Sequence, residues 1–183
     1  MRNRAAIVVL VLAAAARAFA GAAPAGAPAT LGYDVPPGWV LDAAGARKAG
    51  VELMFLPRGK TPETTDRAIA IAYQTKNPQI PDLADLEAFA RADMAATREQ
   101  FPEMLADRWQ PRGLDPRKIR YLSVELYGPT PNRPPPHRVI MIDAGDGFYS
   151  ITYTAETRAI LALPEVDAFF DSLRLTPPES GAR

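Results

Sequence analysis

The chain has 183 residues, with 21 basic and 21 acidic side chains, one histidine and no cysteine. The balanced charge argues against a nucleic-acid-binding domain, because affinity for nucleic acid depends on concentrated positive charge. Without cysteine no disulfide can support the fold, so stability must come from buried apolar surface.

The first 20 residues have the three-part pattern of a secretory signal peptide. Two arginines precede an apolar run at 5–16, and a small-residue cleavage site follows at 18–20. The run is shorter than the roughly 20 residues that span a bilayer. We therefore expect cleavage after Ala20, or after Ala22 as second choice, and no transmembrane span afterwards; an uncleaved anchor is the alternative. Cleavage removes three arginines and no acid, which leaves 21 minus 3, or 18, basic against 21 acidic residues. The mature protein is expected to be mildly acidic and periplasmic or secreted.

Beyond the leader, residues 21–30 form an Ala/Pro/Gly linker with nothing to bury. Residues 31–176 are expected to form a single α+β domain, followed by a flexible tail at 177–183. A domain of this size buries roughly 70% of its unfolded surface, which is enough for one core.

Three strands are expected to open the domain. They start at Trp39, after a Pro-Pro-Gly turn, and continue at 50–56 and 67–73, where side chains alternate in size. In the second strand Val51, Leu53 and Phe55 should share one face. In the third, large residues alternate with alanines, so the alanine face should be covered closely by a helix.

Pro81 and Asp82 are expected to open an amphipathic helix that ends near Pro102. Its apolar stripe consists of Leu83, Leu86, Ala90, Met94, Thr97 and Phe101. After an irregular segment, three antiparallel strands are predicted at 119–127, 139–142 and 148–154.

The last two of these strands form a hairpin around a turn rich in Asp and Gly. A closing helix starts at Pro164. Its apolar face comprises Leu163, Val166, Phe169, Phe170 and Leu173. Strands joined without crossover helices predict an α+β fold, with an antiparallel β-sheet of about six strands flanked by two main helices on one or both faces.

The Pro-Pro-Gly-Trp turn at 36–39, the long central helix, the strand at 148–155 and the helix closing on 170–175 together resemble the PsbP/DcrB-like superfamily. The likeness covers nearly the whole mature domain. It implies an α-β-α sandwich, and exported, mostly non-enzymatic domains, assembly factors and partner-binding modules. It supplies no catalytic residues. The proline-rich loop at 129–136 departs from the family, which puts a shared partner surface there in question.

The one basic and aromatic concentration lies in the irregular segment between the central helix and the fourth strand. Interleaved cations and a tryptophan suit an anionic partner, whereas the alternative is a solvated loop whose tryptophan plugs the core edge. The proline-rich loop has P-x-x-P form, which suits either a polyproline II ligand or a stiff connection. The possible partner contacts are Trp109, Arg112, Arg117, Pro134 and His137.

No motif for catalysis, cofactor or metal stands out. With one histidine and no cysteine, a zinc site would lack its usual ligands, and Asp143 and Asp146 fit a hairpin turn better than a calcium loop. No G-x-S-x-G or glycine-rich phosphate loop is present. We expect no catalytic residues and no cofactor.

Two hypotheses of function follow. In the first, a non-catalytic exported domain binds a protein or envelope component. In the second, a carboxylate-based hydrolase or small-ligand-binding enzyme uses acids that only the fold brings together. A buried pair of acids with raised pKa values in a cleft would favour the second hypothesis.

Overall fold

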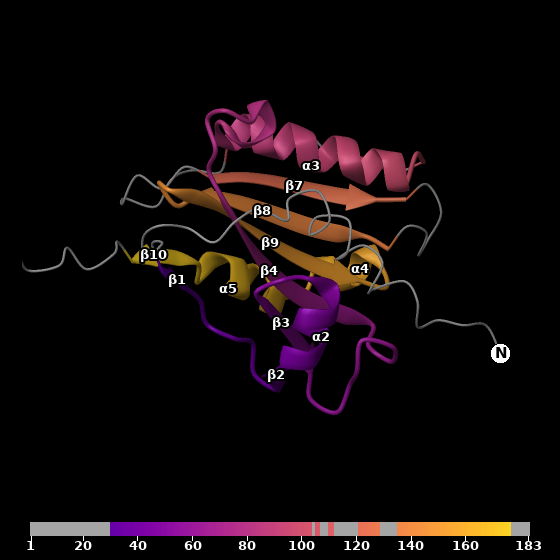
Figure 1. The fold of residues 1–183 in the computed structure, drawn as a ribbon. Coiled ribbons are helices and arrows are strands. Elements are labelled where there is room, and N and C mark those ends of the chain that lie inside the picture. The colour runs from indigo at the N-terminus through magenta and orange to yellow at the C-terminus, as the bar shows by residue number, and fades with distance from the viewer. Residues whose placement is uncertain (1–29, 104, 107–109, 112–120, 129–134, 177–183) are drawn as a thin grey trace, which may run out of the picture.

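The computed structural model describes residues 30–103, 105–106, 110–111, 121–128 and 135–176 of the chain. In this part a single eight-stranded antiparallel sheet lies between two layers (Figure 1). Its strands are β2 (Trp39–Leu41), β3 (Leu53–Pro57), β4 (Arg67–Thr75), β5 (Leu105–Ala106), β6 (Gln110–Pro111), β7 (Tyr121–Tyr127), β8 (His137–Asp143) and β9 (Gly147–Ala155).

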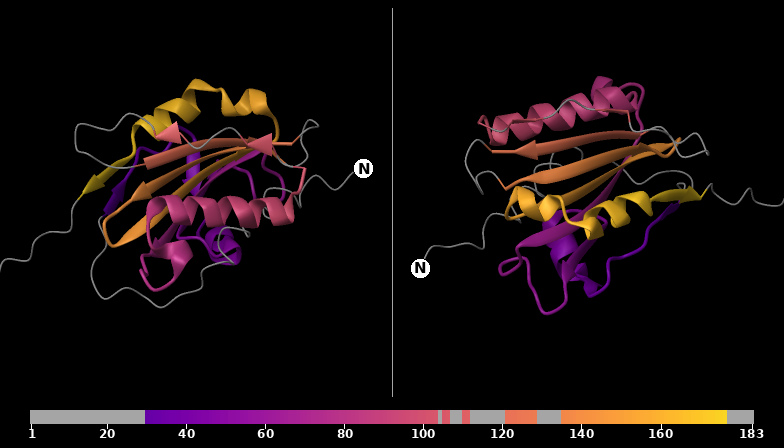
Figure 2. Two further views of the ribbon diagram at one scale, coloured as in Figure 1. Left: turned by 90° about the horizontal axis from the view of Figure 1, so that it is seen from above. Right: turned by 180° about the vertical axis from the view of Figure 1, so that it is seen from behind.

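Helices and a small second sheet form the two outer layers. They are β1 (Thr30–Gly32), α2 (Ala43–Ala49), the 3-10 helix η1 (Pro81–Leu83), α3 (Leu86–Gln100), α4 (Arg158–Leu161), α5 (Pro164–Asp171) and β10 (Arg174–Thr176). Helices α2 and α3 cover one face, and α4, α5 and the β1–β10 sheet cover the other (Figure 2). The predicted α-β-α sandwich is therefore confirmed.

The strand order is β2-β3-β4-β9-β8-β7-β5, and β6 also pairs with β7. Strands β4 and β9 pair along their whole length, from Arg67 opposite Ala155 to Thr75 opposite Gly147. This central pairing joins the first three strands to the three consecutive strands of the second half. All six predicted strands are present, within a few residues of their predicted ends.

The closing helix carries the core of one face, as predicted. Val166, Phe169 and Phe170 of α5 are buried against isoleucines of β4, β8 and β9, with Leu163 and Leu173 packed at the margin. Pro164 occupies the first turn of α5, where its missing N–H costs no hydrogen bond.

Pairing between the two ends of the domain was not predicted. Strand β1 pairs with β10 from Thr30 opposite Thr176 to Gly32 opposite Arg174. Strand β1 thus includes Thr30, which the prediction assigned to the linker. Three-residue strands give too little periodicity to be read from sequence.

Helix α3 packs on the second face over β7, β8 and β9 through Leu86, Phe89, Ala90 and Met94. Its start corrects the sequence prediction: Pro81 and Asp82 form a separate 3-10 turn, and Asp85 is the N-cap of α3. The Ala88 N–H donates to Oδ1 of Asp85 at 2.7 Å, and this bond satisfies a backbone donor at the helix start.

Helix α2 was also not predicted, although its start and stop signals are present. Asp42 caps it by accepting from the Gly45 N–H at 2.9 Å, and Gly50 ends it with a φ of 70°. Its Ala46 and Ala49 pack on the alanines of β4. The prediction that a helix covers the alanine face is therefore confirmed.

The prediction that Val51, Leu53 and Phe55 share one face of the second strand is wrong for Val51. Leu53 and Phe55 belong to the α5 side, but Val51 precedes β3 and packs with the cluster under α2. Alternation holds only within the extended strand, and the strand starts after Val51.

Candidate binding surface

Four of the five predicted contact residues, Trp109, Arg112, Arg117 and Pro134, lie outside the described residues. The described residues next to them show where the irregular segment and the proline-rich loop meet β7. Pro111 pairs with Leu122 at the start of β7, whereas His137, which follows the proline-rich loop, pairs with Leu126 near its end. The two segments therefore join the sheet toward opposite ends of β7, about 13 Å apart at roughly 3.3 Å per residue.

His137 does not suit a contact with a partner, because its side chain is only 2% exposed. It opens β8, and its Nδ1 lies 3.1 Å from the carbonyl oxygen of Pro135. Burial lowers the pKa of His137 to about 4, so the ring is neutral at physiological pH. The prediction that His137 contacts a partner is therefore corrected, whereas the other four residues stay predictions.

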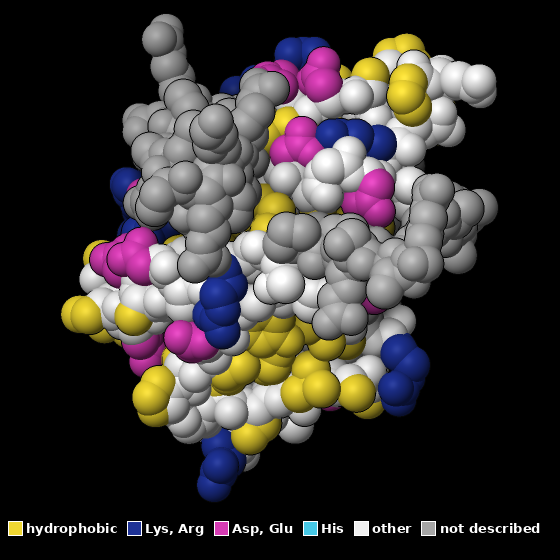
Figure 3. Space-filling view, turned by 90° about the vertical axis from the view of Figure 1, so that its left-hand side faces the viewer, with side chains coloured by type: hydrophobic (Ala, Val, Ile, Leu, Met, Phe, Trp, Pro, Cys, Tyr) yellow, Lys and Arg dark blue, Asp and Glu magenta, His cyan; other side chains and the backbone are white. Residues whose placement is uncertain are grey.

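A different surface stands out at the end of the sheet where β4 ends and β9 begins. Tyr73 and Tyr149 are cross-strand neighbours with ring centroids 4.9 Å apart and an interplanar angle of 55°. Both are half-buried. Figure 3 faces this end of the sheet and shows an exposed patch of hydrophobic side chains on it.

Hydrogen bonds connect the β8–β9 turn to the end of β4. Asp143 accepts hydrogen bonds from the Gly145 N–H at 2.8 Å and from Nζ of Lys76 at 2.6 Å. Gly145 has a φ of 90°, a backbone conformation that favours glycine. Asp146 accepts a hydrogen bond from the Tyr73 hydroxyl at 3.0 Å. The predicted hairpin is confirmed, and both carboxylates have roles within it.

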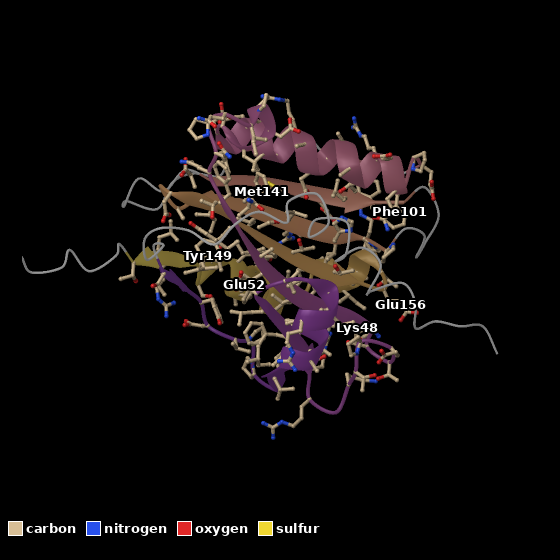
Figure 4. All side chains as sticks on the ribbon, viewed as in Figure 1. Lys48, Glu52, Phe101, Met141, Tyr149 and Glu156 are labelled. Carbon is tan, nitrogen blue, oxygen red and sulfur yellow. The ribbon has the colours of Figure 1, made fainter. Side chains whose placement is uncertain are left out.

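Two acidic side chains, Asp146 and Glu52, act on the tyrosine rings. Burial raises the pKa of Tyr149, a hydrogen bond with the backbone of Leu31 partly offsets this rise, and the negative charges of Asp146 and Glu52 add smaller increases. Burial and Asp146 likewise raise the pKa of Tyr73. Figure 4 shows Glu52 and Tyr149 near each other at this end of the sheet. We call Glu52, Tyr73, Asp146 and Tyr149 the tyrosine surface.

Gly147 allows Tyr73 to lie against the turn, and a side chain there should disturb the surface. A Cβ at this position would clash with the Tyr73 hydroxyl and would lie 2.7 Å from the backbone oxygen of Gln74. We expect Gly147→Ala to lower the free energy of unfolding by about 1–3 kcal/mol, measured by chemical denaturation. The control is Gly59→Ala, where no atom lies within 4 Å of the added Cβ and the cost comes from the φ of 79° alone; a larger loss there than at Gly147 would contradict the packing argument.

No family model and no curated protein matches the chain in sequence. Solved structures do match in fold. Cyanobacterial PsbP (CyanoP) from Synechocystis sp. PCC 6803 has a TM-score of 0.54 at 14% identity, covering 85% of this chain and 98% of CyanoP. LpqN from Mycobacterium tuberculosis, described as involved in cell envelope biogenesis, has a TM-score of 0.50 at 10% identity, covering 84% of this chain and 87% of LpqN.

This chain has a PsbP/DcrB-like fold. The predicted superfamily resemblance is confirmed at the level of fold. Among the described helices of the PsbP-like domain, none is long and apolar enough to cross a membrane.

The described residues offer few other groups suited to catalysis or metal binding. Asp93 of α3 is the one buried acid among residues whose burial is described, at 7% exposure, and burial raises its pKa to about 6. The buried pair of acids that would favour an enzyme is thus not found in this part of the chain. Nor do its described His, Asp and Glu residues form a group of three or more that could hold a metal.

The tyrosine surface was missed because its members are distant in sequence. Tyr73 and Tyr149 are 76 positions apart by their residue numbers, and only the β4–β9 register makes them neighbours. Alternation along 67–73 placed Tyr73 on the face of the large residues, but nothing in the sequence linked it to Tyr149. Knowledge of which strands pair would have been needed to combine them.

Proposed function

We propose that the PsbP-like domain is exported and binds a protein of the cell envelope without catalysing a reaction, with the tyrosine surface as the contact. The observation that carries this proposal is the half-exposed Tyr73–Tyr149 pair at the end of the sheet where β4 ends and β9 begins. Tyrosine is enriched in binding interfaces because a rigid ring gives much contact area at low entropic cost.

Two further observations support this function. The leader has a charged start, an apolar run and a small-residue site, which is typical of export. The fold is similar to that of LpqN, a protein described as involved in cell envelope biogenesis. The second candidate function, a carboxylate-based enzyme, is favoured only by the raised pKa of Asp93 and would require a second acid beside it.

Site-specific photo-crosslinking in the producing cell tests the proposal. A photoreactive amino acid replaces Glu52, which is exposed on the tyrosine surface, or Glu99, which is exposed on α3 as a matched control. We expect a discrete protein adduct at position 52 and none at 99. Intact mass should show that the adduct contains a chain starting at or near Gly21. Equal labelling at both positions, or no adduct at 52, would overturn the binding surface; a full-length chain pelleting with membranes would overturn cleavage.

A further inference from the structure

We propose that β1 is an exchangeable arm, through which two copies of this chain form a dimer by each placing its β1 beside the β10 of the other. We call residues 30–34 the N-terminal arm. Strand β1 pairs with β10 in a small sheet apart from the eight-stranded one. The arm can therefore leave the domain without breaking a ladder of the main sheet. This self-association goes beyond the proposed binding of an envelope protein.

The arm fills a site that becomes open when the arm leaves. Leu31 is buried, at 7% exposure, in the core cluster that includes α5, and the Tyr33 ring contacts Phe55 with centroids 5.5 Å apart. The Asp34 N–H donates to Oγ of Ser172 at 2.9 Å. An arm of identical sequence from a second copy makes the same contacts, so the exchange costs none of them.

A short, stiff hinge joins the arm to the rest of the domain. Residues 36–39 form a turn in which the Trp39 N–H donates to the Pro36 carbonyl oxygen at 3.1 Å and Gly38 has a φ of 81°. Only Val35 lies between the arm and this turn, and the proline after it restricts Val35 to extended conformations. A short hinge favours exchange between copies, because it leaves few conformations in which the arm returns to its own domain.

Exposed apolar side chains lie next to this hinge. Among the residues whose burial is described, four large hydrophobic side chains are exposed, and three of them are Val35, Val40 and Leu41. They lie at the hinge and on the edge strand β2 that follows it. Because a one-residue hinge keeps the two domains close, exchange should bring these side chains against their counterparts across a two-fold axis. This favours a second copy over a foreign strand, since only a second copy carries the same apolar surface beside its hinge.

Disulfide trapping in the protein as isolated from its producing cell tests the exchange, and the natural chain contains no cysteine that could interfere. Thr30 and Thr176 are exposed and opposite each other, so cysteines at these positions lie within reach of a disulfide. A mixture of Thr30→Cys and Thr176→Cys chains is oxidised, and mass spectrometry identifies the link between positions 30 and 176. We expect this heterodimer at about tenfold or more the yield of a control mixture of Glu99→Cys and Thr176→Cys, because pairing raises the local cysteine concentration far above that of random collision.

Two further variants separate arm exchange from ordinary association. Leu41→Asp in both chains should lower the heterodimer yield by about threefold or more, because a carboxylate is costly in an apolar contact. Leu41 is 52% exposed, so the melting temperature should stay that of the parent. The double variant Thr30→Cys/Thr176→Cys should close a disulfide within one chain and sediment as a monomer at concentrations at which the parent is partly dimeric.

A heterodimer yield equal to that of the collision control would overturn the exchange. A closed double variant that dimerises like the parent would contradict it as well, since the domains would then associate without moving the arm. Sedimentation of the unmodified parent needs no substitution, and a parent that stays monomeric at every concentration would also reject the dimer. The photo-crosslinking at position 52 tests the proposed function separately, so either proposal can fail alone.

Discussion

Phe169→Ala is expected to lower the free energy of unfolding by about 3–5 kcal/mol, the usual cost of deleting a buried phenylalanine. Phe169 is 2% exposed and contacts Phe170, 5% exposed, with ring centroids 5.4 Å apart. Both side chains pack α5 against the sheet. Because total stability is typically 5–15 kcal/mol, Phe169→Ala or Phe170→Ala should bring the domain close to unfolding near 37 °C.

Chemical and thermal denaturation of the two variants measure this effect. Leu41→Ala is the matched control, because Leu41 is 52% exposed on the edge strand β2 and its change should stay within about 0.5 kcal/mol. If both phenylalanine variants melt with the parent, α5 does not cover the core.

Asp93→Asn is expected to stabilise the protein at pH 7.5 by up to about 3 kcal/mol. Burial raises the pKa of Asp93 from 3.8 to about 6, and one pKa unit corresponds to about 1.36 kcal/mol. The ionised carboxylate therefore binds protons more tightly in the folded state, so its contribution is fully favourable below pH 3.8 and is lost as pH rises through 6. Asparagine keeps the shape without the charge.

Protonation of His137 should change the free energy of unfolding in the opposite direction to protonation of Asp93, over an overlapping pH range. Its folded pKa of about 4 lies below the ordinary value of 6.5, so its contribution is fully present above pH 6.5 and is lost as pH falls toward 4. In the parent protein the two effects partly cancel. Asp93→Asn should therefore reveal a steeper loss of stability on acidification.

Denaturant titrations of the parent and of Asp93→Asn at pH 4–8 measure whether stability changes with pH in the direction expected for each of the two groups. Asp85→Asn serves as a control, because Asp85 also lies at α3 but is exposed and asparagine remains a good N-cap. A variant at position 93 that is less stable than the parent at pH 7.5 would show that the carboxylate is stabilised by its surroundings.

The sequence alone determined the elements whose signals are local. Alternation placed six strands, the spacing of Leu86, Ala90 and Met94 placed the central helix, and the Asp/Gly turn placed the hairpin before β9. Local signals also existed for α2, in Asp42 and Gly50, but a seven-residue helix carries too few apolar positions for its periodicity to be recognised.

Only the tertiary structure decided what these elements bring together. The β4–β9 register puts Tyr73 beside Tyr149 and Asp146, while His137, expected at the surface, is buried. The pairing of distant strands depends on how the complete faces of the sheet pack, including their contacts with α3 and α5. No short stretch of sequence encodes this pairing. The leader pattern predicted export and the charge count predicted an acidic mature domain, but the position of the tyrosine surface follows from which strand ends meet at one end of the sheet.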